Sequence, residues 1–191
     1  MIDKLPTIYN GHDPGGCFWI LPVKCHSTER FGWESVEECK SAEISLDELD
    51  VDGLLAYFFK KHFDKTLLYN QQRYDDAGGI KGICFPAAFE WNLTYNFYSY
   101  DAIRAMLNDI RLIMDALGST GLDAVPQELS KDIKNWFFTF CDPSLDQAAA
   151  ESLAYSNPSC VIDYYRQFIR CMDEMMDSYP NWPLISIMGP Y

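Results

Sequence analysis

The sequence predicts a helix-rich α+β fold, organised as a single domain over residues 1–191 with a small antiparallel sheet. Three observations lead to this prediction. Several segments repeat apolar residues at helical spacing, one segment alternates apolar and polar residues as a half-buried strand does, and short apolar runs have the length of strands. With 191 residues and 48% hydrophobic residues, the chain is long enough for one well-buried core, whereas two independent domains would each be small.

The first expected elements are short. The segment from Gly11 to Gly16 (GHDPGG) marks a turn-rich start, and residues 17–21 (CFWIL) form a strand that Pro22 stops. From His26 to Ser45 the pattern is irregular, and a short helix is expected near residues 35–40.

The first clear helix is expected over residues 51–63, because apolar residues recur there at helical spacing. Asp50 or Asp52 can cap its first turn. Lys60 and Lys61 lie near its end, where the helix dipole favours cations. The residues on its predicted inner face are Val51, Leu54, Leu55, Phe58 and His62.

The clearest strand is expected over residues 89–98, where apolar and polar residues alternate. Period two puts the two kinds on opposite faces, so the strand should be half buried in a sheet with one face in water. The polar face is either a solvated surface or a recognition surface, since amides and tyrosines give adaptable hydrogen bonds. The apolar set is Phe89, Trp91, Leu93, Tyr95 and Phe97, and the polar set is Glu90, Asn92, Thr94, Asn96 and Tyr98.

A long helix is expected directly after this strand. Ser99 is suited to be its N-cap, and Gly118 is suited to end it as the C′ residue. A continuous stripe of apolar side chains at helical spacing would face the core. The stripe consists of Ile103, Met106, Leu107, Ile110, Ile113, Met114 and Leu117.

Three more helices and a last strand are expected towards the C-terminus. One helix begins near Pro126, because proline is favoured in a first turn, and a short helix covers residues 147–154. The last helix begins at residues 157–158 (NP) and continues until Pro180. Residues 184–188 (LISIM) would add a final strand to the sheet.

The charge of the chain limits its partners. It has 28 Asp and Glu residues against 15 Lys and Arg residues, a formal net charge of −13. Residues 1–95 hold 15 acids and 9 bases, and residues 96–191 hold 13 and 6, so the charge belongs to the whole folded body and not to a tail. Such a field disfavours DNA, RNA and anionic membranes as partners, and it attracts a basic protein.

The sequence predicts a cytoplasmic protein. The N-terminal segment MIDKLPTIYNGHDPGG lacks the apolar core and the cleavage pattern of a secretory signal. The longest apolar runs are too short to span a bilayer. Seven cysteines, an odd number with no CxxC pair, fit reduced thiols better than a set of disulfides.

Negative charge is densest in residues 43–52. Residues 48, 50, 52 and 53 match positions 1, 3, 5 and 6 of a calcium-binding EF-hand loop, but position 12, which must be a bidentate carboxylate, is Phe59. Calcium is therefore disfavoured. Carboxylates stabilised by the dipole of the following helix explain the run, and a docking patch for a basic partner is the functional alternative.

Zinc is disfavoured by spacing. Cys17, Cys25, His26 and Cys39 are suitable ligand types, but zinc ligands usually come in pairs two to four residues apart. Only Cys25 and His26 are close, and adjacent residues rarely bind one ion together. We therefore expect neither a metal nor another cofactor, and we expect the cysteines to be buried or idle thiols.

No catalytic motif accompanies the charge. The chain has no GxSxG or SxxK sequence, and residues 78–82 (GGIKG) lack the GK[ST] ending of a phosphate-binding loop. The alternative to a binding protein is an enzyme of unknown class, with a site assembled in space from dispersed histidines, cysteines and carboxylates. Its candidate participants are His12, His26 and Cys17.

In size, charge and architecture, the chain resembles bacterial immunity proteins of toxin–antitoxin and contact-dependent systems. The resemblance implies a non-catalytic protein that binds a basic toxin, often a nuclease, and blocks its active site through complementary charge and shape. Neither nucleic acid nor a membrane would be a partner. The candidate contact residues are Glu43, Asp47, Glu48, Asp50, Asp52, Asp75, Asp76, Glu90, Asn92 and Asn96.

Overall fold

The computed structural model describes residues 17–26, 36–47, 54–67, 70, 95–136 and 146–188, and it confirms the helix-rich α+β class. The strands are β1 (Cys17–Cys25), β2 (Val36–Glu38), β3 (Ile44–Asp47), β4 (Asn96–Ser99) and β5 (Leu184–Met188). The α-helices are α2 (Leu54–Lys61), α3 (Tyr100–Thr120), α4 (Gln127–Trp136), α5 (Gln147–Ser156) and α6 (Ser159–Ser178). Two 3₁₀ helices are η2 (Lys40–Ala42) and η4 (Leu122–Ala124).

The strands form one sheet in which every pairing is antiparallel, as predicted. On one side β1 pairs with β5, and β5 pairs in turn with β4. On its other side β1 pairs with two short strands, β3 alongside residues 17–20 and β2 alongside residues 23–25. The strand beside β1 is therefore interrupted opposite Leu21 and Pro22.

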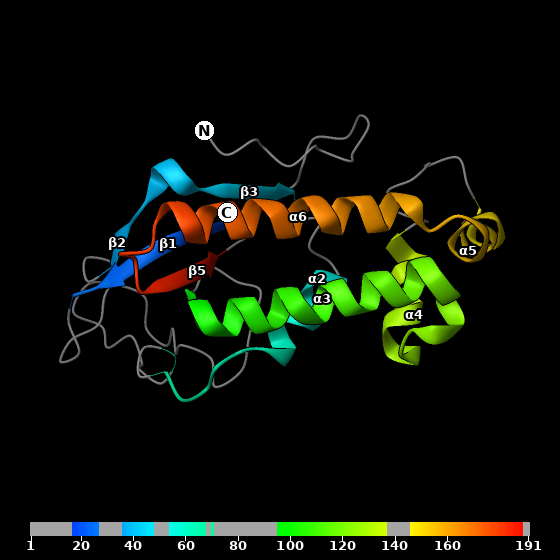
Figure 1. Ribbon diagram of the computed structural model, residues 1–191, viewed down its shortest axis with the longest axis horizontal. Helices are drawn as coiled ribbons and strands as arrows, with labels where there is room; N and C mark the ends of the chain where they lie inside the picture. Colours follow the sequence, from blue (N-terminus) through cyan, green and yellow to red (C-terminus); the bar gives the residue numbers. More distant parts are fainter. Residues whose placement is uncertain are drawn as a thin grey trace.

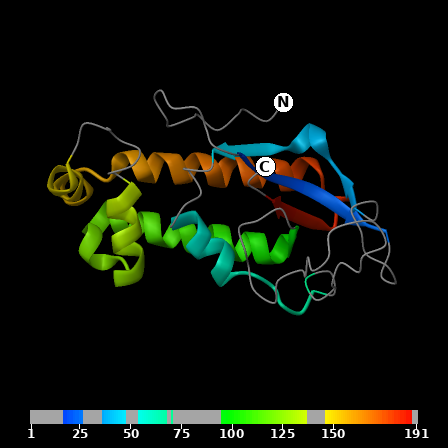
Figure 2. The same ribbon diagram turned by 180° about the vertical axis from the view of Figure 1, so that it is seen from behind.

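The two longest helices connect strands of this sheet. α3 follows directly on β4, and α6 leads back into β5. The two helices lie side by side and run in opposite directions, with the sheet towards one end and with α4 and α5 at the other (Figure 1, and from behind in Figure 2). Strands β4 and β5, which are far apart in the sequence, thereby become neighbours.

One face of the sheet, here called the helix face, packs against the helices. Ile20, Ile185 and Tyr98 of the sheet belong to the same buried cluster as the inner sides of α2, α3 and α6. Aromatic rings fill the junction: the Phe59 ring centroid lies 5.9 Å from that of Tyr98 and 6.4 Å from that of Phe168. Each fully buried ring contributes about 1.5–3 kcal/mol by leaving water, so this cluster is a major source of stability.

The opposite face of the sheet, here called the outer face, carries a separate and smaller cluster among the described residues. Successive side chains of a strand point to opposite faces, so Leu21 and Val23 point away from the face that Ile20 occupies. The outer cluster consists of Leu21, Val23, Tyr95, Phe97, Leu184 and Met188, with Trp19, Cys25, Val36 and Leu67 packed against it.

The prediction for α3 is confirmed at its start and wrong at its end. The Ser99 hydroxyl accepts a hydrogen bond from the Ala102 N–H at 3.1 Å, as an N-cap does. The helix continues past Gly118 and ends before Gly121, whose φ of 87° lies in the left-handed region that favours glycine. A Cβ at Gly118 would lie 3.4 Å from Ile162 Cδ1, at van der Waals contact, so this glycine lies inside α3 where the helix approaches α6.

The other helices and the last strand agree with their predictions. α2 ends with Lys60 and Lys61, α4 begins directly after Pro126, and α5 starts at the predicted residue. The Asn157 side chain accepts a hydrogen bond from the N–H of Ser159 at the start of α6. β5 covers the predicted residues. Among the described residues, no helix has the length and hydropathy needed to cross a bilayer.

Two predictions for the N-terminal part are wrong. β1 does not stop at Pro22 but continues to Cys25, and residues 36–38 form a strand where a helix was expected. Pro22 is paired with Ile185, and its carbonyl accepts a hydrogen bond from the Cys39 N–H at 2.9 Å. Proline lacks an N–H, and in this strand that N–H would point to the side of β1 where the neighbouring strand is interrupted. Proline is therefore tolerated, because no continuous strand on that side requires the donor.

The water-exposed face predicted for residues 89–98 is wrong where the structure describes them. Asn96 is 1% exposed and Tyr98 is fully buried. The Asn96 amide donates to the Ile187 carbonyl at 3.3 Å, and the Tyr98 hydroxyl donates to the Phe59 carbonyl at 2.8 Å. The alternation is present, but the face that was predicted to meet water is the helix face of the sheet.

Asn70 takes the place of a neighbouring strand at β4, which lies at the edge of the sheet. Its side chain is 2% exposed. Nδ2 donates to the Phe97 carbonyl at 2.9 Å, and Oδ1 accepts from the Phe97 N–H at 3.1 Å. Nδ2 also donates to the Asp64 carbonyl at 2.7 Å. One amide side chain thus makes both hydrogen bonds that a paired strand would make at this position.

Candidate functional site

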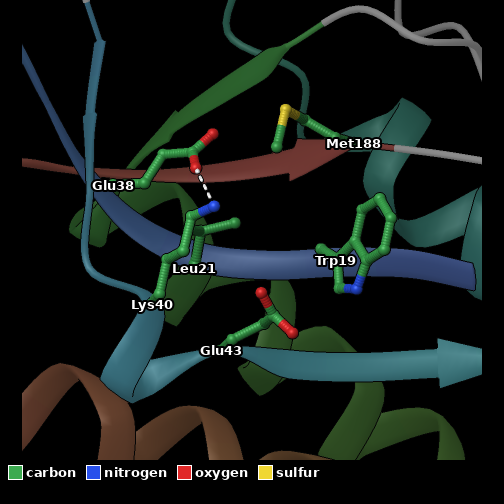
Figure 3. Close-up of a pocket in the computed structure, with 6 residues that line it drawn as sticks. All are labelled: Trp19, Leu21, Glu38, Lys40, Glu43 and Met188. Carbon is green, nitrogen blue, oxygen red and sulfur yellow. Dashed lines mark ion pairs between the residues drawn. The ribbon is translucent and has the colours of Figure 1, made fainter. Parts of the chain in front are cut away.

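A pocket of about 310 Å³ opens on the outer face of the sheet, where the strand beside β1 is interrupted. Figure 3 shows the side chains around it, which come from β1, β5, the end of β2 and the link between β2 and β3. This volume lies at the lower end of the range for ligand sites, about 300–1,000 Å³. The lining residues are Trp19, Leu21, Glu38, Lys40, Glu43 and Met188.

Pro22 explains why the pocket lies there. In an antiparallel pair, the N–H and C=O of a residue point to the same side of the strand. The Pro22 carbonyl points towards the β2 side, because it accepts from the Cys39 N–H. Pro22 has no N–H to donate. A strand paired continuously along this side of β1 would therefore have one carbonyl, opposite Pro22, without a hydrogen-bond donor. The chain turns away through η2 instead, and the positions beside the turn stay open.

Glu38 is held in place by two neighbours. The Tyr95 hydroxyl donates to its Oε1 at 2.7 Å, and Lys40 Nζ lies 3.6 Å from its Oε2. The Glu38 side chain is only 19% exposed, so these contacts are partly shielded from water. The charge of Glu38 is therefore largely balanced inside the pocket.

Glu43 differs from Glu38 because its charge is not balanced. It follows η2 at the rim of the pocket and is exposed. Its carboxylate forms neither an ion pair nor a hydrogen bond with any residue in the part of the chain that the structure describes. In Figure 3 it stands on the same face of the sheet as the Trp19 indole. It is therefore the carboxylate of this pocket that can accept a cation from outside.

Trp19, Leu21 and Met188 form the apolar part of the pocket. Leu21 and Met188 are buried, whereas Trp19 is half-buried. Trp19 and Met188 lie opposite each other on β1 and β5, so the sheet itself sets their spacing. An aromatic face beside an unbalanced carboxylate attracts cations, because the ring quadrupole and the negative charge act in the same direction.

The structure shows where three of the predicted contact residues lie. Glu43 lines the pocket, and Asp47 ends β3, where it pairs with Cys17. The prediction that Asn96 faces water is wrong, because it is buried beside Ile187 and is covered by the helices, so a partner at the surface cannot reach it. The remaining candidates lie outside the described residues; they are Glu48, Asp50, Asp52, Asp75, Asp76, Glu90 and Asn92.

Two candidate residues of the alternative enzymatic site, Cys17 and His26, lie far apart. Cys17 begins the nine-residue strand β1 and His26 follows its end, which separates them by about 30 Å at roughly 3.3 Å per residue. His26 is exposed, and its Nε2 lies 3.0 Å from Glu37 Oε2. His12 lies outside the described residues. A Cys17–His26 pair is therefore not assembled.

A second group of titratable side chains connects α2 to α3. Lys61 Nζ and His62 Nε2 each lie 2.8 Å from Asp109 Oδ2. The hydrogen bond from Lys61, followed by that from His62, holds the pKa of Asp109 below its usual value, and the same bond raises the pKa of Lys61. Because both nitrogens contact one oxygen, the group ties the two helices together and does not offer a free base.

Four of the cysteines carry free thiols. Cys39 and Cys171 are buried, Cys25 is half-buried and Cys160 is exposed. Burial raises the pKa of Cys25 to about 12, so this thiol stays protonated and unreactive at neutral pH. Within the described ranges, no three His, Cys, Asp or Glu side chains are grouped closely enough to hold a metal ion.

Sequence reasoning found Glu43 but missed the other pocket residues. Glu38 and Lys40 belong to no motif, and their segment was expected to be helical. A signal was present at Pro22, since proline inside an apolar strand indicates a break in the neighbouring ladder. That signal would have pointed to the residues beside positions 21 and 22.

Comparisons of the chain with models of protein families, with curated proteins and with solved structures found no match. Function is therefore inferred from the pocket and from the charge of the chain.

Proposed function

We propose that this chain is a non-catalytic, acidic protein-binding domain of the cytoplasm that binds a basic protein, in the manner of a bacterial immunity protein that neutralises a nuclease-type toxin. The observation that carries the proposal is the net charge of −13, spread over both halves of the sequence. Nucleic acids and anionic membranes are unsuitable partners, because they would be repelled by the same charge.

The pattern of ion pairs supports a cationic partner. Most of the cations that the structure describes have an internal partner, either a carboxylate or an aromatic ring, whereas several exposed carboxylates have no cation within the described ranges. The uncompensated charge is thus negative and available to cations from outside. The engaged cations are Lys24, Lys40, Lys61, Arg104, Arg111, Lys134 and Arg166, and the exposed carboxylates without a cation among the described residues include Glu43, Asp115, Asp123, Glu174 and Asp177.

The pocket on the outer face supports one location for the contact. Glu43 supplies an exposed charge, and the half-buried Trp19 supplies apolar surface that a partner can bury. Charged groups at the rim of an interface speed the encounter, and a buried apolar centre slows dissociation. Both are present within this one site.

The test begins with the neighbouring genes, one of which should encode a basic nuclease if the proposal is right. That protein is purified as a nuclease-inactive variant for binding and as the active enzyme for inhibition. The dissociation constant should rise at least about tenfold between about 50 and 400 mM NaCl, because salt screens opposite charges. One equivalent of this chain should abolish the nuclease activity.

An unrelated acidic protein of similar charge is the control for nonspecific attraction, and it should leave the nuclease active. The proposal fails if no complex forms, if affinity ignores ionic strength, or if the bound nuclease retains full activity.

A further inference from the structure

We propose that the pocket on the outer face binds an arginine side chain, which stacks on the Trp19 indole and forms an ion pair with Glu43. This inference rests on the proposed function and names the chemical group that the partner would present. Three properties of the pocket lead to it: its dimensions, its aromatic wall and its uneven charge.

The dimensions suit a single long side chain. A volume of about 310 Å³ is too small for a folded element and large enough for one side chain with its first waters. Leu21 and Met188, which are 1% and 4% exposed, form the apolar floor beneath such a side chain. Trp19 is half-buried and lines the pocket, so its indole is the aromatic wall beside which a planar end group would lie.

The charges select where a cation enters. Lys40 already pairs with Glu38, so it repels a second cation from that carboxylate. Glu43 has no such neighbour among the described residues. An incoming cation is therefore directed to the Glu43 side of the pocket, which is where Figure 3 shows the Trp19 indole.

The combination of an aromatic ring and a carboxylate favours arginine over lysine. A guanidinium group is planar, so it can lie flat on an indole and present its N–H groups to a carboxylate at the same time. It is also more weakly hydrated than an ammonium group and loses less on leaving water. Lysine can satisfy the charge but cannot stack.

The probe is a capped tripeptide, acetyl-Gly-Arg-Gly-amide, compared with its lysine and citrulline counterparts. Citrulline keeps the planar shape without the charge. The indole N–H of Trp19 reports binding in ¹H–¹⁵N NMR spectra, and Trp19→Phe assigns it among the five tryptophans. The arginine peptide should shift this signal with millimolar affinity, the lysine peptide should bind several-fold more weakly, and the citrulline peptide should bind least.

Variants at the rim test the charge. Glu43→Gln should weaken binding of the arginine peptide about two- to fivefold. Glu174→Gln is the matched control, because it removes an exposed charge on α6, away from the pocket, and should change nothing. Lys40→Gln should strengthen binding, because it removes the repelling charge and releases Glu38.

Three results would overturn the inference: equal binding of arginine and citrulline peptides, equal effects of Glu43→Gln and Glu174→Gln, or an unchanged Trp19 signal at saturating peptide. Its failure is distinguishable from that of the proposed function. If the basic protein partner binds in a salt-dependent way and Glu43→Gln does not weaken it, only the pocket assignment is wrong. If the peptide binds and the protein does not, the proposed function is wrong.

Discussion

The two faces of the sheet differ in what their side chains contact. The helix face is packed against α2, α3 and α6 in one continuous apolar cluster that includes Phe59 and Phe168. The outer face combines a smaller cluster with charged groups at a pocket. Under the proposed function, stability comes mainly from the helix face and recognition from the exposed groups of the outer face. Substitutions on the helix face should then alter stability, and substitution of the exposed pocket residue Glu43 should alter binding alone.

The largest effect is expected at Phe59, which is fully buried between Tyr98 and Phe168. Phe59→Ala should lower the free energy of unfolding by about 3–5 kcal/mol, through lost burial and the cavity that remains. Urea denaturation measures it as a lower midpoint with an unchanged slope. Phe59→Leu, which leaves a smaller cavity, should cost less. A loss below about 1 kcal/mol for the alanine variant would show that this cluster is not the main support of the fold.

The next effect is expected at Asn70, which serves the edge of the sheet. Asn70→Leu has a similar size but leaves the N–H and C=O of Phe97 without their partner, so it should cost about 2–3 kcal/mol. Hydrogen exchange of the Phe97 amide should become faster. Unchanged exchange at Phe97 would mean that water or another group replaces Asn70 without cost.

A smaller effect is expected at Asp109, which joins α2 to α3 through Lys61 and His62. Asp109→Asn should cost about 1 kcal/mol at neutral pH, measured by urea denaturation. The pKa of Asp109 is lowered from 3.8 in the folded state, so its contribution is present above that value and disappears as the pH falls through the lower folded value. The pKa of Lys61 is raised from 10.5, so its contribution is present below that value and is lost at more alkaline pH.

The difference in stability between the wild type and Asp109→Asn should therefore be largest at neutral pH and shrink towards both acid and alkaline pH. A difference that does not vary with pH would show that the substitution acts through packing and not through charge.

Substitution of Ser186, on the outer face, is expected to have a small effect of opposite sign, a gain in stability. It lies opposite Leu21 and Phe97 and is fully buried, and within the described residues its hydroxyl has no hydrogen-bond partner. Ser186→Ala removes that unsatisfied group with little change of volume, so stability should rise by about 0.5–1 kcal/mol. A loss of stability in thermal or urea denaturation would reveal a partner for this hydroxyl.

The smallest effect on stability is expected at Glu43. Glu43→Gln removes an exposed charge without a neighbouring cation among the described residues, so the free energy of unfolding should change by less than about 0.5 kcal/mol. The same variant should weaken arginine binding. If it unfolds the protein instead, recognition and stability are not divided between the two faces.

The helices and the last strand could be predicted well from the sequence. The apolar stripe of α3 and its cap at Ser99 follow from local rules, because helical spacing and capping depend on residues close together in the chain. The start of α4 after Pro126 and the strand at residues 184–188 follow in the same way. Gly118 was mistaken for the end of α3, since its role depends on contact with Ile162 of another helix.

The outer face could not be predicted, because its properties depend on which elements become neighbours. Alternation correctly separates Asn96 from Phe97, but only the packed fold shows which of the two faces meets the helices. The pocket similarly requires β1, β5 and the turn at η2 to meet. Of its residues, Glu43 was found through charge alone.

The proline in β1 also bears on the speed of recognition. The gap between β2 and β3 follows from the covalent structure of Pro22, so the pocket exists before a partner arrives and no strand has to open. A partner therefore does not wait for a rare conformation of this chain. Under the proposed function, the net charge of −13 would attract the basic partner, and association would approach the rates of electrostatically steered complexes, about 10⁸ M⁻¹s⁻¹. The lifetime of that complex would then depend on its dissociation rate, which the contacts between the outer face and the partner would set.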